Sequence, residues 1–168
     1  MTKIDEKKLV NYLPLILIIG FILLVILCWE FFQGRFDLRE SLRLFMGLFF
    51  LIFSFFKFLD WKGFAYAYAG YDVIAKHFLV YAYIYPIIEM ILGFLFILNI
   101  FPIFTNIITI IVMSISSIGV IQTVLGKRKI HCACLGAVIK LPMTTVTIIE
   151  DVGMGLMALV MLVWIFLQ

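Results

Sequence analysis

Long apolar runs separated by short polar segments dominate the pattern of this chain. They predict helices over about 12–32, 42–59, 78–100, 103–125 and 143–167. Each run is close to the roughly 20 apolar residues that a helix needs to cross a bilayer, where only internal hydrogen bonds can satisfy the backbone. The pattern therefore predicts an all-α fold, a polytopic membrane helical bundle forming one domain over residues 1–168.

The segment between the second and third runs has a different character. Residues 61–77 combine Trp61, Gly63 and Gly70 with a series of Tyr, Phe and Ala residues. Trp and Tyr favour the depth of the lipid head groups, because one end of each ring is apolar and the other can hydrogen-bond. We expect this segment to lie at the membrane surface without crossing it.

Composition agrees with a chain that lies in lipid. Hydrophobic residues make up 65% of the chain and charged residues 14%, whereas a soluble domain is about 45–50% apolar. The net charge of +3 is modest and most basic residues lie in predicted loops, so no nucleic-acid partner is expected. The sequence has no phosphate-binding glycine loop, HExxH motif or nucleophile elbow, which favours an accessory protein over an enzyme.

Basic residues are divided unequally between the two sides of a five-helix arrangement. Ten of the 13 Lys and Arg residues fall in the N-terminal head, the second loop and the fourth loop, and the other three are Arg35, Arg39 and Arg43. Positively charged loops are retained in the cytoplasm. We therefore expect an inner-membrane protein whose N-terminus and fourth loop are cytoplasmic.

Candidate chemistry is concentrated in that fourth loop, where His131, Cys132 and Cys134 follow three consecutive cations at 127–129. An imidazole and cations favour the thiolate, which is both a nucleophile and a ligand for soft metals. A disulfide between thiols one residue apart is strained and exchangeable, and the same pair can hold a soft ion such as Cu(I). The spacing does not choose between a redox pair and a metal pair.

The last helix carries a second candidate signal. Residues at alternating steps of four and three share one face: Met143, Thr147, Glu150, Met154, Met157 and Met161. Such a stripe is normally a helix-packing seam. However, a carboxylate at membrane depth is costly and usually marks a pathway or an interface. In the alternative interpretation, Glu150, Met154, Met157 and Met161 extend a soft-metal path from the loop.

Two further charges, Lys57 and Glu89, fall inside predicted membrane helices. Pairing between them would lower the cost of burying either one, so we interpret them as structural or coupling charges. Small residues let membrane helices approach closely, and four glycines are expected to serve this purpose: Gly93, Gly119, Gly153 and Gly155.

Several motifs in this order resemble the DoxX-like membrane families, and most closely the MauE branch of methylamine-utilisation proteins. They are Gly47 to Phe50, Phe55 to Asp60, Gly63-Phe64, Tyr85-Pro86 with Glu89 and Gly93, and Cys132-Ala133-Cys134-Leu135-Gly136. The resemblance implies a four-helix core over about 42–168, with the first helix added. It also implies a role in processing, transport or maturation of the disulfide-rich small subunit of methylamine dehydrogenase, alongside a thioredoxin-like partner.

Three hypotheses follow from the sequence. In the first, Cys132 and Cys134 cycle between dithiol and disulfide with a protein partner, and the resemblance favours this one. In the second, His131, Cys132 and Cys134 capture a soft metal ion, with a metal chaperone as the partner. In the third, the chain is a scaffold for another membrane subunit and the cysteines are incidental. The predicted cytoplasmic position of the loop suits thiols or metal better than oxidative folding.

Overall fold

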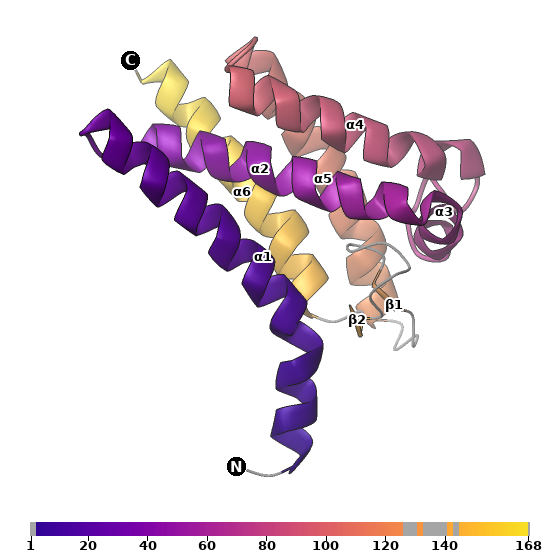
Figure 1. Ribbon diagram of the computed structural model, residues 1–168. Helices are drawn as coiled ribbons and strands as arrows, with labels where there is room; N and C mark the ends of the chain where they lie inside the picture. Colours follow the sequence, from indigo (N-terminus) through magenta and orange to yellow (C-terminus); the bar gives the residue numbers. More distant parts are fainter. Residues whose placement is uncertain (1–2, 126–130, 133–140, 143–144, 168) are drawn as a thin grey trace.

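The computed structural model describes residues 3–125, 131–132, 141–142 and 145–167, with side chains described over 13–123, 125 and 150–167. Its helices are α1 Lys3–Gln33, α2 Leu38–Leu59, α3 Trp61–Ala69, α4 Leu79–Leu98, α5 Pro102–Leu125 and α6 Thr145–Phe166 (Figure 1). Strands β1 His131–Cys132 and β2 Leu141–Pro142 pair antiparallel. The predicted helical architecture is confirmed for this part of the chain, apart from the two-residue ladder.

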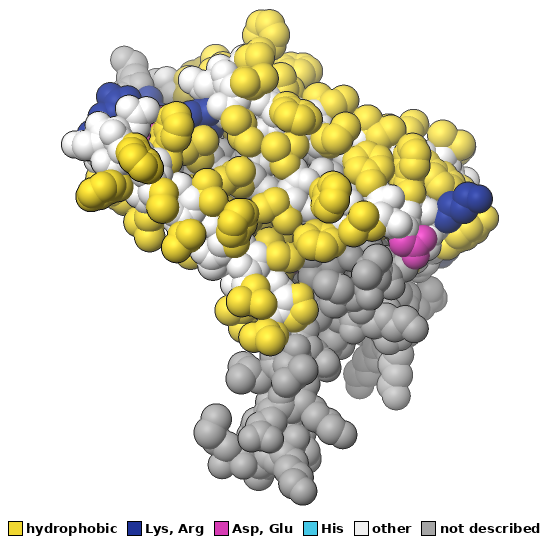
Figure 2. All heavy atoms as spheres, in the orientation of Figure 1, with side chains coloured by type: hydrophobic (Ala, Val, Ile, Leu, Met, Phe, Trp, Pro, Cys, Tyr) yellow, Lys and Arg dark blue, Asp and Glu magenta, His cyan; other side chains and the backbone are white. Residues whose placement is uncertain are grey.

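Four of the described helical segments are long and apolar enough to cross a membrane: Leu13–Gln33, Leu38–Leu59, Leu79–Leu98 and Pro102–Thr123. Figure 2 shows hydrophobic side chains spread over one face of the bundle, with Lys and Arg near its edges. So large an exposed apolar surface is stable only in lipid. The chain is therefore a multi-pass membrane protein. The predicted fifth span coincides with α6, whose first residues, 145–149, are described as backbone alone.

The helices pack mainly as two pairs, α2 with α4 and α5 with α6, while α1 lies on α2 and α3 lies against α4. At the crossing of α2 and α4, a Cβ added to Gly93 would lie 3.0 Å from the Gly47 carbonyl oxygen, so the two backbones are in contact. The close approach predicted at Gly93 is confirmed. Among the described residues, an added Cβ at Gly153 would meet nothing within 4 Å, so no close approach is found there, and at Gly155 the contact is an ordinary one of 3.7 Å.

Several helix ends differ from the prediction for local reasons. Helix α1 begins at Lys3 and not near 12, because Lys and Glu continue a helix well outside the apolar segment. Helix α2 begins at Leu38 and not near 42, because the Asp37 side chain accepts a hydrogen bond from the Arg39 N–H at 2.9 Å. The surface segment contains a helix that was not predicted, α3, capped by Asp60, whose side chain accepts from the Gly63 N–H at 3.0 Å.

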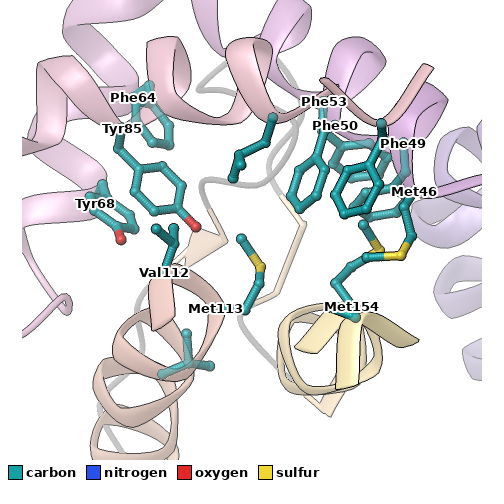
Figure 3. Close-up of a cluster of buried hydrophobic side chains, with 14 of the residues drawn as sticks. Met46, Phe49, Phe50, Phe53, Phe64, Tyr68, Tyr85, Val112, Met113 and Met154 are labelled. Atoms are coloured by element: carbon teal, nitrogen blue, oxygen red, sulfur yellow. The ribbon is translucent and has the colours of Figure 1, made fainter. Parts of the chain in front are cut away.

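The hydrophobic core is rich in aromatic rings and is centred on α2. Phe49 and Phe53 stack with their ring centroids 4.0 Å apart, and Phe50 stacks on Phe96 of α4. Figure 3 shows these α2 side chains directed toward Met113 of α5 and Met154 of α6. Both helix pairs therefore share one core, which fixes the positions of the polar side chains described below.

Candidate functional site

The cysteine loop connects α5 to α6 and is folded back on itself. The β1–β2 ladder pairs His131 with Pro142 and Cys132 with Leu141, which holds the Cys132 backbone at the end of the bundle where α5 ends and α6 begins (Figure 1). Cys134 lies outside the described residues, as do the side chains of His131 and Cys132. Cys28, the one other cysteine of the chain, is a free thiol on the exposed surface of α1.

The methionine stripe of α6 faces the protein interior. Met154 and Met161 are buried in the shared core, and Figure 3 shows Met154 in the same cluster as Met46 and Met113. Met157 is half-buried and lines an apolar groove of about 390 Å³ between α1, α2 and α6. These contacts fit a packing seam, with flexible thioether side chains filling irregular gaps. Glu150 is half-buried in the first two turns of α6, whereas Met143 and the side chain of Thr147 lie outside the described residues.

Lys57 and Glu89 form an ion pair in the interior of the bundle, where their relative exposures are 5% and 4%. The Lys57 Nζ donates hydrogen bonds to both carboxylate oxygens. The same ammonium lies 5.4 Å from the ring centroid of Phe64 and 5.0 Å from that of Tyr85. At these distances the ring faces attract a cation. Lys57 therefore has aromatic partners in addition to its carboxylate.

Asp72, which follows α3, is fully buried and accepts three hydrogen bonds. Its Oδ1 accepts from the backbone N–H groups of Ile74 and Ala75 at 2.9 and 2.8 Å, and its Oδ2 accepts from the Tyr68 hydroxyl at 2.9 Å. Burial, with smaller contributions from Tyr85 and Asp72, raises the pKa of Tyr68, which lies in α3 outside the membrane spans. The Tyr68 phenol therefore stays protonated and remains a donor to Asp72.

A third polar contact joins α5 to α6. The Ser116 hydroxyl donates to Asp151 Oδ2 at 2.8 Å. Three neighbouring hydroxyls behave differently, because Thr109, Ser117 and Thr123 each donate to the carbonyl four residues earlier in α5. Bonding within the helix satisfies a hydroxyl in an apolar environment, as expected of packing residues. Ser116 instead makes a polar contact between helices.

The ion pair and these groups surround a small internal cavity of about 20 Å³, lined by Lys57, Phe64, Tyr68, Tyr71, Tyr85, Ser116 and Asp151. A second pocket of about 310 Å³ has a polar lining: Gly70, Tyr71, Asp72, Val73, Lys76, His77, Gln122 and Thr123. Tyr71 lines both spaces. Because Gln122 and Thr123 belong to the last turn of α5, the larger pocket opens at the same end of the bundle as the cysteine ladder.

The sequence pointed to Lys57 and Glu89 but not to the groups around them. Tyr68, Tyr85 and Ser116 are typical residues of a membrane interface or a packing surface, and only the fold brings them together. Asp72 carried a usable signal, since an aspartate within an aromatic, apolar segment needs donors, and Tyr68 four residues earlier supplies one. Among the described residues, no group of three or more His, Cys, Asp and Glu side chains could hold a metal ion.

Comparison with known proteins gives one family match. The sequence model of methylamine utilisation protein MauE matches residues 35–165. The match begins two residues after α1 ends and includes the cysteine loop, the ion pair and most of α6. No curated protein and no solved structure matches the chain.

Proposed function

Since the chain belongs to the MauE family of membrane proteins, we propose that it is an accessory redox protein whose Cys132 and Cys134 exchange disulfides with a partner protein. By family, the process served is methylamine utilisation, and the partner is a disulfide-containing protein undergoing maturation or transport, or the thioredoxin-like protein that acts on it. The described helices would form a DoxX-like core that presents the cysteine loop at one membrane surface.

The observation that carries this proposal is the family match over the segment that holds both thiols. Two features of the chain support it. Three cations and His131 precede the cysteines in sequence and favour the reactive thiolate. The β1–β2 ladder holds the Cys132 backbone at the same end of the bundle as a polar pocket of about 310 Å³.

The proposed reaction is thiol–disulfide exchange. One thiolate of the chain attacks a disulfide sulfur of the partner, which forms a mixed disulfide and releases one partner thiolate. The second cysteine then attacks the mixed disulfide, so that the partner leaves as a dithiol and the chain keeps the Cys132–Cys134 disulfide. Two electrons pass from the chain to the partner, and the reverse sequence oxidises the partner.

The test is trapping of the mixed disulfide in membranes that contain the full-length protein. Cys134→Ser should accumulate a covalent adduct with the partner when Cys132 attacks first, and Cys132→Ser should do so if the order is reversed. The double variant should form none. Cys28→Ser is the matched control, and it should form the same amount of covalent adduct as the unmodified protein. Adducts in the double variant would refute the assignment of these thiols.

A second candidate function is soft-metal binding or transport, and the clustering of Met46, Met113 and Met154 in the core favours it (Figure 3). In this function His131, Cys132 and Cys134 would capture an ion such as Cu(I), which Glu150, Met154, Met157 and Met161 would pass on. Anaerobically purified protein should then contain copper that is lost in Cys132→Ser. Copper-free protein with two thiols exposed by reduction would favour the redox function.

The distribution of basic residues supports a topology with the cysteine loop in the cytoplasm. A membrane-impermeant maleimide should then label Cys132 and Cys134 in inverted membrane vesicles and not in intact cells. Labelling in intact cells would place the loop on the opposite side and would favour an oxidising compartment for the exchange.

A further inference from the structure

The polar groups inside the bundle form a connected set that the thiol chemistry does not require. Lys57 and Glu89 are paired, and the ring of Tyr85, one helical turn before Glu89 on α4, has its centroid 5.0 Å from the Lys57 ammonium. Ser116 lines the same cavity as Tyr85 and donates a hydrogen bond to Asp151. These five side chains come from α2, α4, α5 and α6. Ionisable groups at membrane depth are costly and usually mark a pathway for ions or protons.

The cavity among these side chains has the size of a water molecule. Its volume of about 20 Å³ exceeds the roughly 10–15 Å³ that a buried water requires. Its lining also supplies several hydrogen-bonding partners, among them Lys57, Tyr85 and Ser116. Tyr71 also lines the polar pocket of about 310 Å³, which provides room for solvent.

Lys57 can remain charged in the interior while Glu89 changes its protonation state. Loss of the carboxylate charge would normally leave a buried ammonium without compensation. Here the faces of Phe64 and Tyr85 lie within 5.4 Å of Nζ and continue to attract the cation. Figure 3 shows Phe64, Tyr68 and Tyr85 grouped on one side of the core, and of these rings Phe64 and Tyr85 lie next to the ammonium.

We propose that Glu89 is a proton-binding site, loaded from the polar pocket at the loop end of the bundle. A proton passes from solvent in that pocket, past Tyr71 to a water that Ser116 helps to hold in the small cavity, and through the Tyr85 hydroxyl to a Glu89 carboxylate oxygen. Tyr85 gives its own proton to Glu89 and receives another from the water, so its charge is unchanged. No electron moves, and the site works whether the cysteine loop handles disulfides or metal.

Titratable groups from each neighbouring element face this site, and they set its electrostatics. Lys57 of α2 is the charge paired with Glu89, Asp151 of α6 lines the cavity together with Lys57, and Asp72 is hydrogen-bonded to Tyr68, which lines the same cavity. The remaining polar neighbours are Tyr68 of α3, Tyr81 of α4 and Ser116 of α5.

Infrared difference spectroscopy on the full-length protein in lipid vesicles tests the proposal. A pH titration should show a reversible carbonyl band of a protonated carboxylic acid, which is absent in Glu89→Gln and unaffected in Cys132→Ser. After transfer to D₂O this band should shift quickly. In Tyr85→Phe and Ser116→Ala the exchange should slow by roughly 10²-fold, the order of rate lost when a positioned proton-transfer group is removed.

The matched control is Tyr66→Phe, which removes the hydroxyl of an exposed tyrosine on the same short helix that carries Tyr68. Exchange in this variant should equal that of the parent. The proposal is overturned if no titrating band is lost in Glu89→Gln, because a purely structural ion pair stays charged at all pH values that leave the protein folded. Equal exchange rates in Tyr85→Phe, Ser116→Ala and the parent would overturn the route.

Discussion

Gly119 of α5 lies against the backbone of Tyr71 and Asp72, two residues that line the polar pocket. A Cβ added there would lie 2.7 Å from the Tyr71 carbonyl oxygen and 2.9 Å from the Asp72 Cα. Both atoms belong to the backbone of the 70–77 connection, so no side-chain rotation can relieve the contact. Since carbon atoms pack at about 3.5–4.0 Å, this connection would have to move by roughly 0.5–1 Å.

We therefore expect Gly119→Ala to lower the free energy of unfolding. Overpacking of this kind costs about 1–3 kcal/mol. Alanine recovers about 0.5–1 kcal/mol, because it is a better helix former than glycine. The net loss is then about 1 kcal/mol, within a range of about 0–2.5 kcal/mol. The movement also strains the hydrogen bonds that hold the Asp72 carboxylate at 2.8 to 2.9 Å.

The measurement is reversible unfolding in mixed micelles with increasing SDS, followed by circular dichroism. Gly153→Ala is the matched control, because it is also a glycine within a helix but has nothing within 4 Å of an added Cβ. This variant should be unchanged or more stable by up to about 1 kcal/mol. Equal stability of the two variants would refute the close contact between α5 and the 70–77 connection.

Three further predictions use the same unfolding assay. Lys57→Met should lower stability by about 3–5 kcal/mol, because it leaves a buried carboxylate, and adding Glu89→Leu should restore most of the loss; additive losses would refute the pairing. Burial raises the pKa of Tyr68 in the folded protein. The contribution of its protonated phenol to the free energy of unfolding is therefore complete below the unfolded pKa of about 10, and it is lost as the pH rises toward and through the folded pKa. In Tyr68→Phe the free energy of unfolding should fall less steeply at alkaline pH, and an unchanged pH dependence would contradict this role of Tyr68. Asp37→Ala should cost about 1 kcal/mol through loss of the α2 cap, whereas Asp37→Asn should be nearly neutral.

Hydrophobic patterning alone was sufficient to predict the membrane class and the long helices. Apolar runs of the length of a bilayer have few alternatives, because lipid forces the backbone to form its own hydrogen bonds. The pattern could not place the ends of helices that continue into water, where local capping by Asp37 and Asp60 decides. The short helix α3 was missed for the same reason.

The chemistry of the cysteine loop was also a sequence-level inference, because two thiols, an imidazole and three cations lie within eight consecutive residues. The polar site around the Lys57–Glu89 pair could not be inferred from the sequence, because its side chains are spread over the chain at positions 57, 68, 72, 85, 89, 116 and 151. Side chains so far apart in sequence meet only when helices cross, and the crossing positions depend on contacts such as that of Gly47 with Gly93. The sequence determined which charges had to be satisfied inside the membrane. The tertiary structure decided their partners, since polar groups in an apolar medium take whichever donor or cation the packing brings within reach.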